Sequence, residues 1–121
     1  MMRGIRGAIT IKANDKGLIE DKTEILLREM IQQNHLEADS IASIFISVTD
    51  DIDAGFPAAA VRRFSGFTHV PVMCMREIPV PGSLPLAIRV MIHANTDIPQ
   101  KDINHIYLEG ATILRPDLSE K

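Results

Sequence analysis

The segment at residues 70–95 reads VPVMCMREIPVPGSLPLAIRVMIHAN, with two apolar runs on either side of a proline-rich loop. The runs at 70–78 and 87–95 are rich in Val, Ile and Met, which is typical of strands that are at least half buried. The loop between them contains three prolines and Gly82, so the two strands need not form a tight hairpin. The sequence therefore predicts two strands with a gap between them that can hold a ligand.

Three polar side chains interrupt these strands, namely Cys74, Glu77 and Arg89. A guanidinium group inside a buried strand is costly unless a negative group meets it, so Arg89 indicates either an internal ion pair or an anionic ligand. The alternation of side chains along a regular strand places Cys74 and Glu77 on opposite faces. Either the strand ends or bulges near Met75, or only one of the two side chains faces the site.

The two faces of the second strand differ in character. Its side chains alternate, so one face is apolar throughout, whereas the other face holds Arg89 together with Met91, His93 and Asn95. We therefore predict that this strand separates a hydrophobic core from a polar site.

Length and composition indicate one globular domain spanning residues 1–121. A chain of 121 residues and 13.4 kDa is too short for two domains, and 45% hydrophobic with 24% charged residues is ordinary for a globular protein. Only five aromatic residues, no tryptophan and a net charge of −3 disfavour a nucleic-acid-binding protein, which needs stacking side chains or a basic stripe. The expected partner is therefore a small molecule.

Cysteine and histidine usage indicates a reducing, cytoplasmic setting and no metal site. The single cysteine excludes an intrachain disulfide, and the four histidines are too far apart in sequence to match a metal-ligand spacing. The chain starts without the apolar run of a signal peptide, and no apolar segment is long enough to span a bilayer, so we expect no membrane association. Asp50, Asp51 and Asp53 follow an apolar run, and we predict a solvated turn there in preference to a metal site.

The rest of the chain predicts an α+β domain. Its apolar spacing predicts a strand at 3–12, a helix at 18–34, a central strand covered on both faces at 41–49, a short helix at 56–64, and a last strand at 103–108 and 111–114 that is interrupted at Glu109 and Gly110. With the two strands above, this order gives a mixed five-stranded sheet with helices on one face. The uncovered face of such a sheet predicts a homo-oligomer.

Several segments, taken together in this order and spacing, resemble the monofunctional AroH-class chorismate mutases. They are residues 3–8 (RGIRGA), 56–58 (FPA), 60–62 (AVR) and 70–72 (VPV), Cys74, Met75 and Glu77, residues 88–91 (IRVM), His105, and residues 107–109 (YLE) and 114–118 (LRPDL). The resemblance extends from the first residues to Ser119, and the complete set in register is specific although each segment alone is weak. It implies a pseudo-α/β barrel formed as a homotrimer, with three active sites in clefts between neighbouring subunits.

The resemblance also implies a reaction, the Claisen rearrangement of chorismate to prephenate on the route to phenylalanine and tyrosine, with no cofactor and no metal. In this pericyclic step one ether C–O bond breaks while a C–C bond forms, and the substrate is a dicarboxylate that must fold its side chain over its ring. The enzyme must therefore hold a compact conformer and stabilise charge on the departing ether oxygen. Guanidinium groups suit both tasks.

Matching the family motifs residue by residue gives the expected catalytic roles. Arg89 would donate to the ether oxygen and to a carboxylate, and Arg6 would clamp the side-chain carboxylate. Glu77 would accept a hydrogen bond from the ring hydroxyl with Cys74 beside it. Tyr107 would donate near the side-chain carboxylate.

The same matching implies the remaining substrate contacts. The apolar walls would be Phe56, Ala58, Val72, Met73 and Leu114. Arg62 and Arg115 would supply positive potential at the cleft mouth and on a mobile tail that begins at about residue 115. Members of the family carry Lys where this chain has Ala59, so one cationic contact at the mouth is expected to be missing, which would weaken substrate capture.

The residues alone leave simpler interpretations open. Arg89 belongs to a structural ion pair about as often as to a ligand site, a lone cysteine is more often inert than functional, and Tyr107 and Phe56 are core residues by default. A small trimeric imine/enamine deaminase and a non-catalytic metabolite sensor are the competing functions. An acid, a thiol, a phenol and several arginines on apolar strands, with many of the acids on or near the first helix, favour an anionic ligand.

Overall fold

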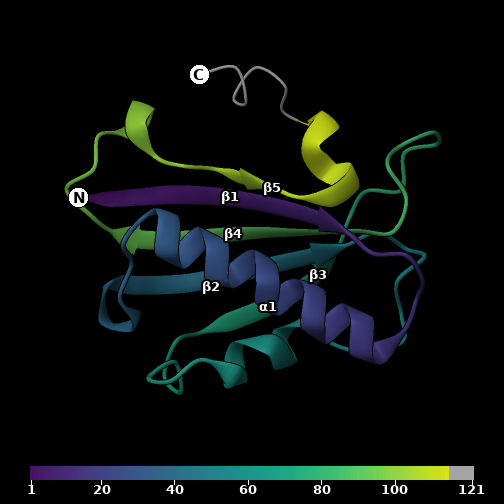
Figure 1. The fold of residues 1–121 in the computed structure, drawn as a ribbon, viewed down its shortest axis with the longest axis horizontal. Helices are drawn as coiled ribbons and strands as arrows, with labels where there is room; N and C mark the ends of the chain where they lie inside the picture. Colours follow the sequence, from purple (N-terminus) through teal and green to yellow (C-terminus); the bar gives the residue numbers. More distant parts are fainter. Residues whose placement is uncertain (115–121) are drawn as a thin grey trace.

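A computed structural model of the chain describes residues 1–114, and Figure 1 shows its fold. The strands are β1 (Met2–Thr10), β2 (Ile41–Val48), β3 (Val72–Arg76), β4 (Ala87–Asn95) and β5 (Ile106–Tyr107). The α-helix is α1 (Lys16–Gln33), and the 3-10 helices are η1 (Ala38–Ser40), η2 (Pro57–Arg63), η3 (Gln100–Asp102) and η4 (Glu109–Leu114). The predicted tail from residue 115, with Arg115, lies outside the described residues.

The strands form one mixed sheet in the order β3-β2-β4-β1-β5. β4 pairs antiparallel with β1 and with β2, whereas β3 runs parallel to β2 and β5 runs parallel to β1. The α+β fold with a mixed five-stranded sheet is therefore confirmed. Both outer strands of the sheet are short, and the two long strands β1 and β4 lie side by side near its middle (Figure 1).

α1 and η2 cover one face of the sheet (Figure 1). α1 begins at Lys16 because the side chain of Asp15 accepts a hydrogen bond from the Leu18 backbone N–H at 3.0 Å and caps the first turn. The guanidinium group of Arg63 joins η2 to α1 through three carboxylates, those of Glu20, Asp21 and Glu24, at 2.8 to 3.0 Å. The hydrophobic core lies between these helices and the sheet, and its largest fully buried apolar side chains are Ile5, Ile9, Ile19, Leu26, Leu27, Met30, Ile44, Ile46, Ile88 and Ile92.

Gly7 lets α1 approach the sheet closely. A Cβ at this position would lie 2.4 Å from the Met30 sulfur and 3.0 Å from a methyl group of Leu26. Gly7→Ala is therefore expected to lower the free energy of unfolding by about 1–3 kcal/mol, the usual cost of overpacking a core. Urea unfolding measures the loss, with Gly4→Ala as the control because a Cβ there meets the Met91 sulfur at 3.3 Å on the other face. Equal stability of the two variants would contradict this contact.

The bounds of two predicted strands need correction. β3 begins at Val72, later than predicted, because Pro71 has no N–H to add to the sheet, although its carbonyl accepts the Ile44 N–H at 2.9 Å. Residues 111–114 are not a strand but part of η4. The chain turns at Glu109, whose φ is +53°, and the Gly110 N–H then donates to Thr10 Oγ1 at 2.9 Å. The predicted short helix at 56–64 is present as the 3-10 helix η2.

The sheet surface opposite α1 is the open face. The strand register determines which side chains are neighbours on this face. It pairs Met91 with Arg6 on β1 and with Phe45 on β2, and it pairs Arg89 with Ser47. Phe45 is 38% exposed on this face, so the prediction that strand 41–49 is covered on both faces does not hold within one chain. Met73, which pairs with Phe45 on β3, is 61% exposed. Within residues 1–114, no helix is both long and apolar enough to cross a bilayer.

Candidate active site

Arg89 lies at the middle of the sheet, on the open face. Its neighbours along β4, Ile88 and Val90, are buried against the core, so strand alternation points the guanidinium group the other way. Across the sheet, Arg89 pairs with Ala8 on β1 and with Ser47 on β2. The predicted separation of an apolar face from a polar face on this strand is confirmed.

Glu77 follows β3 directly and reaches the same face as Arg89. Its backbone N–H donates to the Val48 carbonyl at 2.8 Å, which continues the pairing of β2 with the chain beyond Arg76. Oε1 of Glu77 lies 3.5 Å from Nη1 of Arg89, and Oε2 accepts a hydrogen bond from the Ser47 hydroxyl. The side chains of Arg89 and Glu77 are 42% and 24% exposed, so this is a loose, partly solvated ion pair that leaves the guanidinium group open to a ligand.

A cavity of about 260 Å³ on the open face unites four of the predicted catalytic residues. We call it the arginine pocket, and it is lined by Arg6, Gly7, Phe45, Ser47, Glu77, Arg89, Val90, Met91 and Tyr107. Arg6 comes from β1 and Tyr107 from the neighbouring strand β5, and the Arg6 backbone N–H donates to Nδ1 of His105 at 2.9 Å. Two guanidinium groups, a carboxylate and a phenol therefore border one cavity, a combination suited to a carboxylate ligand that also carries a hydroxyl.

A second group of predicted residues lies on the other side of β3. A cavity of about 410 Å³ is lined by Phe56, Ala58, Ala59, Arg62 and Cys74, and we call it the cysteine pocket. An adjoining cavity of about 400 Å³ shares Ala58 and Arg62 with it and adds Val72. Phe56, Ala58 and Arg62 come from η2 and its N-cap, so this site is made by η2 together with β3.

Within one chain, Cys74 and Glu77 point to opposite faces of the sheet, and of the two only Glu77 lines the arginine pocket. Cys74 pairs with Ile46, whose side chain is buried in the core, and therefore points to the helix side of the sheet. Glu77 stands three residues later and points to the open face, as the alternation of an extended chain requires. Partial burial raises the pKa of the Cys74 thiol, and a hydrogen bond with the Ala58 backbone opposes that shift. The thiol is therefore neutral at pH 7 and a poor nucleophile.

The two remaining predicted contacts within residues 1–114, Leu114 and Met73, both lie on the side of the open face. Leu114 lines a small cavity together with Glu77 and Arg89, next to the arginine pocket. Met73 lies on the open face of β3, outside both the arginine pocket and the cysteine pocket.

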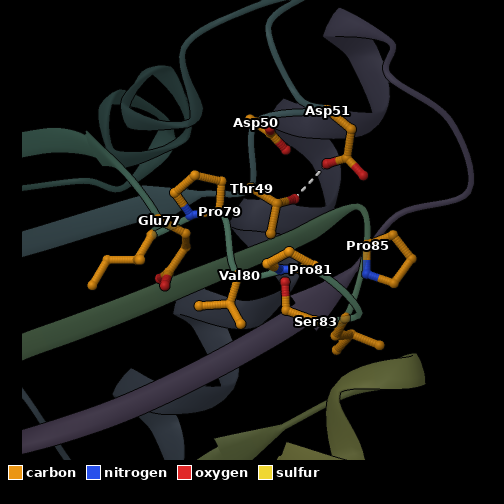
Figure 2. A pocket seen from close by; sticks show the side chains of 11 residues that line it. Thr49, Asp50, Asp51, Glu77, Pro79, Val80, Pro81, Ser83 and Pro85 are labelled. Carbon is orange, nitrogen blue, oxygen red and sulfur yellow. Dashed lines mark hydrogen bonds between the residues drawn. The ribbon is translucent and has the colours of Figure 1, made fainter.

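Glu77 also borders a third cavity, between the proline-rich loop and the turn after β2, which Figure 2 shows from close by. In this loop pocket, of about 260 Å³, the Thr49 hydroxyl donates to Asp51. The other oxygen of Asp51 accepts the Leu86 backbone N–H at 2.9 Å, and the Ile52 N–H donates to the Thr49 carbonyl at 3.0 Å. The predicted turn is confirmed, and Asp51 serves to hold the end of the loop.

Sequence reasoning missed Ser47, which touches both the cavity and the Glu77 carboxylate. The sequence does indicate a polar face here, because Ser43, Ser47 and Thr49 are at alternate positions of an otherwise apolar strand and so point to the same face. The pairing of Ser47 with Arg89 requires the strand order, which the sequence does not state.

Comparisons with known proteins agree on one family. Residues 2–118 match the family model described as chorismate mutase type I. Proteins named chorismate mutase AroH from Bacillus subtilis (strain 168) and Thermus thermophilus are 47% and 44% identical over 119 residues, covering 98% of this chain and 94% and 97% of theirs. A solved chorismate mutase from Clostridium thermocellum superposes with a TM-score of 0.88 at 52% identity, over 91% of this chain and 97% of that one. The chain therefore belongs to the type I chorismate mutase family.

Proposed function

We propose that this chain, as a chorismate mutase, rearranges chorismate to prephenate in the arginine pocket. The observation that carries the proposal is the convergence of Arg6, Glu77, Arg89 and Tyr107 on one cavity from four separate segments of the chain. Chorismate is a dicarboxylate with a ring hydroxyl, and these side chains supply two planar cationic donors, a neutral donor and a carboxylate acceptor. The product would feed the synthesis of phenylalanine and tyrosine.

The mechanism requires positioning and electrostatics only. Arg6 clamps the side-chain carboxylate and favours the folded conformer, in which the two carbon atoms that bond lie close together. Arg89 donates to the ether oxygen, where negative charge develops as the C–O bond lengthens, and so stabilises the transition state more than the ground state. The neutral Cys74 thiol acts as a wall of the site and forms no bond to the substrate.

Glu77 is proposed to accept a hydrogen bond from the ring hydroxyl of chorismate. Glu77→Gln keeps one acceptor oxygen, whereas Glu77→Ala removes both, so we expect the Gln variant to retain more activity than the Ala variant. The difference is expected to be up to about tenfold in kcat/KM, the upper value of one hydrogen bond between neutral groups. Steady-state kinetics with both variants measures it, and equal losses would show that the negative charge, and not the acceptor, is what matters.

We further propose that the active site is shared between neighbouring copies of the chain in a homotrimer. The arginine pocket and the cysteine pocket lie on opposite sides of β3, so one copy cannot offer both to the same ligand. Contact between two different patches is heterologous, and a heterologous contact closes into a ring when the rotation allows it. Exposed Phe45 and Met73 on the open face provide apolar surface for such a contact.

The setting proposed for this trimer is the cytoplasm. Cys74 is exposed in the single chain, and a reducing compartment keeps such a thiol free.

No group of three or more His, Cys, Asp or Glu side chains within residues 1–114 is placed to hold a metal ion. The mechanism above assigns every step to residues of the chain itself.

Following the ultraviolet absorbance of chorismate with purified protein tests the activity. Decay of the chorismate band well above the spontaneous rate, with formation of prephenate, is the expected result. A metabolite sensor would bind chorismate without accelerating its decay, and an imine deaminase would leave chorismate unchanged. Either of these results would overturn the proposed function.

A further inference from the structure

We propose that Ser47 is a positioning residue for the rearrangement, whose hydroxyl holds the Glu77 carboxylate away from a full ion pair with Arg89. This inference rests on the proposed function of the arginine pocket. Ser47 lines the arginine pocket and its hydroxyl donates to Glu77, so we assign it a role in orienting that carboxylate.

Ser47 lies at the centre of the site. It is on β2, where it pairs with Arg89 on one side and with Met75 of β3 on the other, and it lines the arginine pocket. Its hydroxyl donates to Oε2 of Glu77, and the residue is only partly exposed. Because Glu77 lies one residue beyond the end of β3, its long side chain depends on such contacts for a fixed orientation.

The distances indicate what this hydrogen bond achieves. Other arginines of the chain contact carboxylates at the short distance of a charge-assisted hydrogen bond, 2.8 Å for Arg28 with Glu24 and for Arg63 with Asp21. The Arg89 to Glu77 distance is 3.5 Å, although the two groups face each other across the same cavity. A carboxylate that is tied to Ser47 through one oxygen is unable to turn both oxygens to the guanidinium fork.

This restraint matters for the chemistry at both ends of the pair. A bidentate ion pair with Glu77 would occupy the donors that Arg89 must offer to the ether oxygen and would neutralise its charge at that point. It would also turn both Glu77 oxygens toward Arg89 and away from the substrate hydroxyl. Ser47 therefore keeps Arg89 and Glu77 close together without letting them satisfy each other.

Neighbouring hydroxyl groups on β2 and just after it have different partners. Ser43 points to the same face of β2 as Ser47, but its hydroxyl contacts Nδ1 of His93 at 3.2 Å, away from the arginine pocket. Thr49 contacts Asp51 and the Ala87 carbonyl and holds the loop end. Ser43 is thus a matched control, because its loss removes a hydroxyl from the same strand and face without touching Glu77.

The test uses Ser47→Thr and Ser47→Val, which have the same shape and differ in the hydroxyl, with Ser47→Ala and Ser43→Ala beside them. We expect Ser47→Val and Ser47→Ala to lower kcat about tenfold with little change in KM, while Ser47→Thr stays within about threefold of the native chain. Ser43→Ala is expected to keep the native rate. Thermal unfolding of each variant gives its stability, and the comparison of Val with Thr holds even if Ser47→Ala folds poorly.

A second measurement separates positioning from a general packing role. In a Glu77→Ala background Ser47 has no carboxylate to hold, so Ser47→Val and Ser47→Thr are expected to have equal kcat there. A tenfold difference that persists without Glu77, or equal rates for Thr and Val with Glu77 present, would overturn the role of Ser47 while leaving the proposed function in place. Absence of turnover in the native chain would overturn the proposed function itself, and the Ser47 role with it.

Discussion

Arg89→Lys is expected to lower kcat by about 10²- to 10³-fold while the protein still folds. Arg89 is partly exposed and contacts Glu77 only loosely. Replacing it with lysine therefore has little effect on the free energy of unfolding, although a lysine makes fewer contacts. A lysine ammonium group carries the same charge but is a point donor, whereas the planar guanidinium group can donate to the ether oxygen and a carboxylate at once. The loss should therefore appear in the chemical step.

Three measurements define this result. Steady-state kinetics gives kcat and KM, and circular dichroism with thermal unfolding establishes that the variant is folded. Arg28→Lys is the matched control, because Arg28 lies on α1 and pairs with Glu24 at 2.8 Å, away from both pockets. Near-native turnover by Arg89→Lys would contradict the electrostatic mechanism proposed above.

Two inactive variants are expected to restore activity to each other when they are refolded together. Arg89→Lys damages the arginine pocket, and Arg62→Glu places a negative charge in the cysteine pocket, where it repels a dicarboxylate substrate. If a site takes one pocket from each of two copies, a mixed trimer contains interfaces at which both pockets are intact. A site is intact only when its arginine pocket comes from an Arg62→Glu copy and its cysteine pocket from an Arg89→Lys copy. Equal amounts that assort at random give this combination at about one quarter of the interfaces, so the mixture should recover about a quarter of the native activity.

The control for this experiment pairs two variants of the same pocket. Arg89→Lys and Glu77→Ala both alter the arginine pocket, so no interface in their mixture is intact and no recovery is expected. Native mass spectrometry establishes that mixed assemblies have formed. Mixed trimers of the first pair that stay inactive would exclude a shared site, and a monomer in solution would exclude it outright.

The elements that sequence alone predicted well are those with a strong local pattern. The alternation in β1 and β4 and the helical spacing in α1 fix these elements to within about two residues. Residues 111–114 were wrongly predicted as a strand because their conformation depends on a distant contact, the hydrogen bond of the Gly110 N–H to Thr10. The order of the strands depends in the same way on pairing between β1 and β4, which are far apart in sequence.

The site was predictable where a residue conflicts with its surroundings. Arg89 and Glu77 are charged groups on apolar strands, and that conflict, together with the family resemblance, singled them out. Ser47 shows no such conflict, since serine is small and uncharged, and only the register of β2 with β3 brings it to Glu77. The same register decides that Cys74 and Glu77 face opposite sides, a question that the sequence left open.

β3 consists of five residues and separates the cysteine pocket from Glu77 and the arginine pocket. In the proposed ring, each copy of this strand serves two catalytic centres, one on each side. A substitution that improves one centre by shifting the β3 backbone also displaces groups of the other. Selection on the two centres is thereby coupled, and we expect β3 to evolve more slowly than the solvent-facing side of α1.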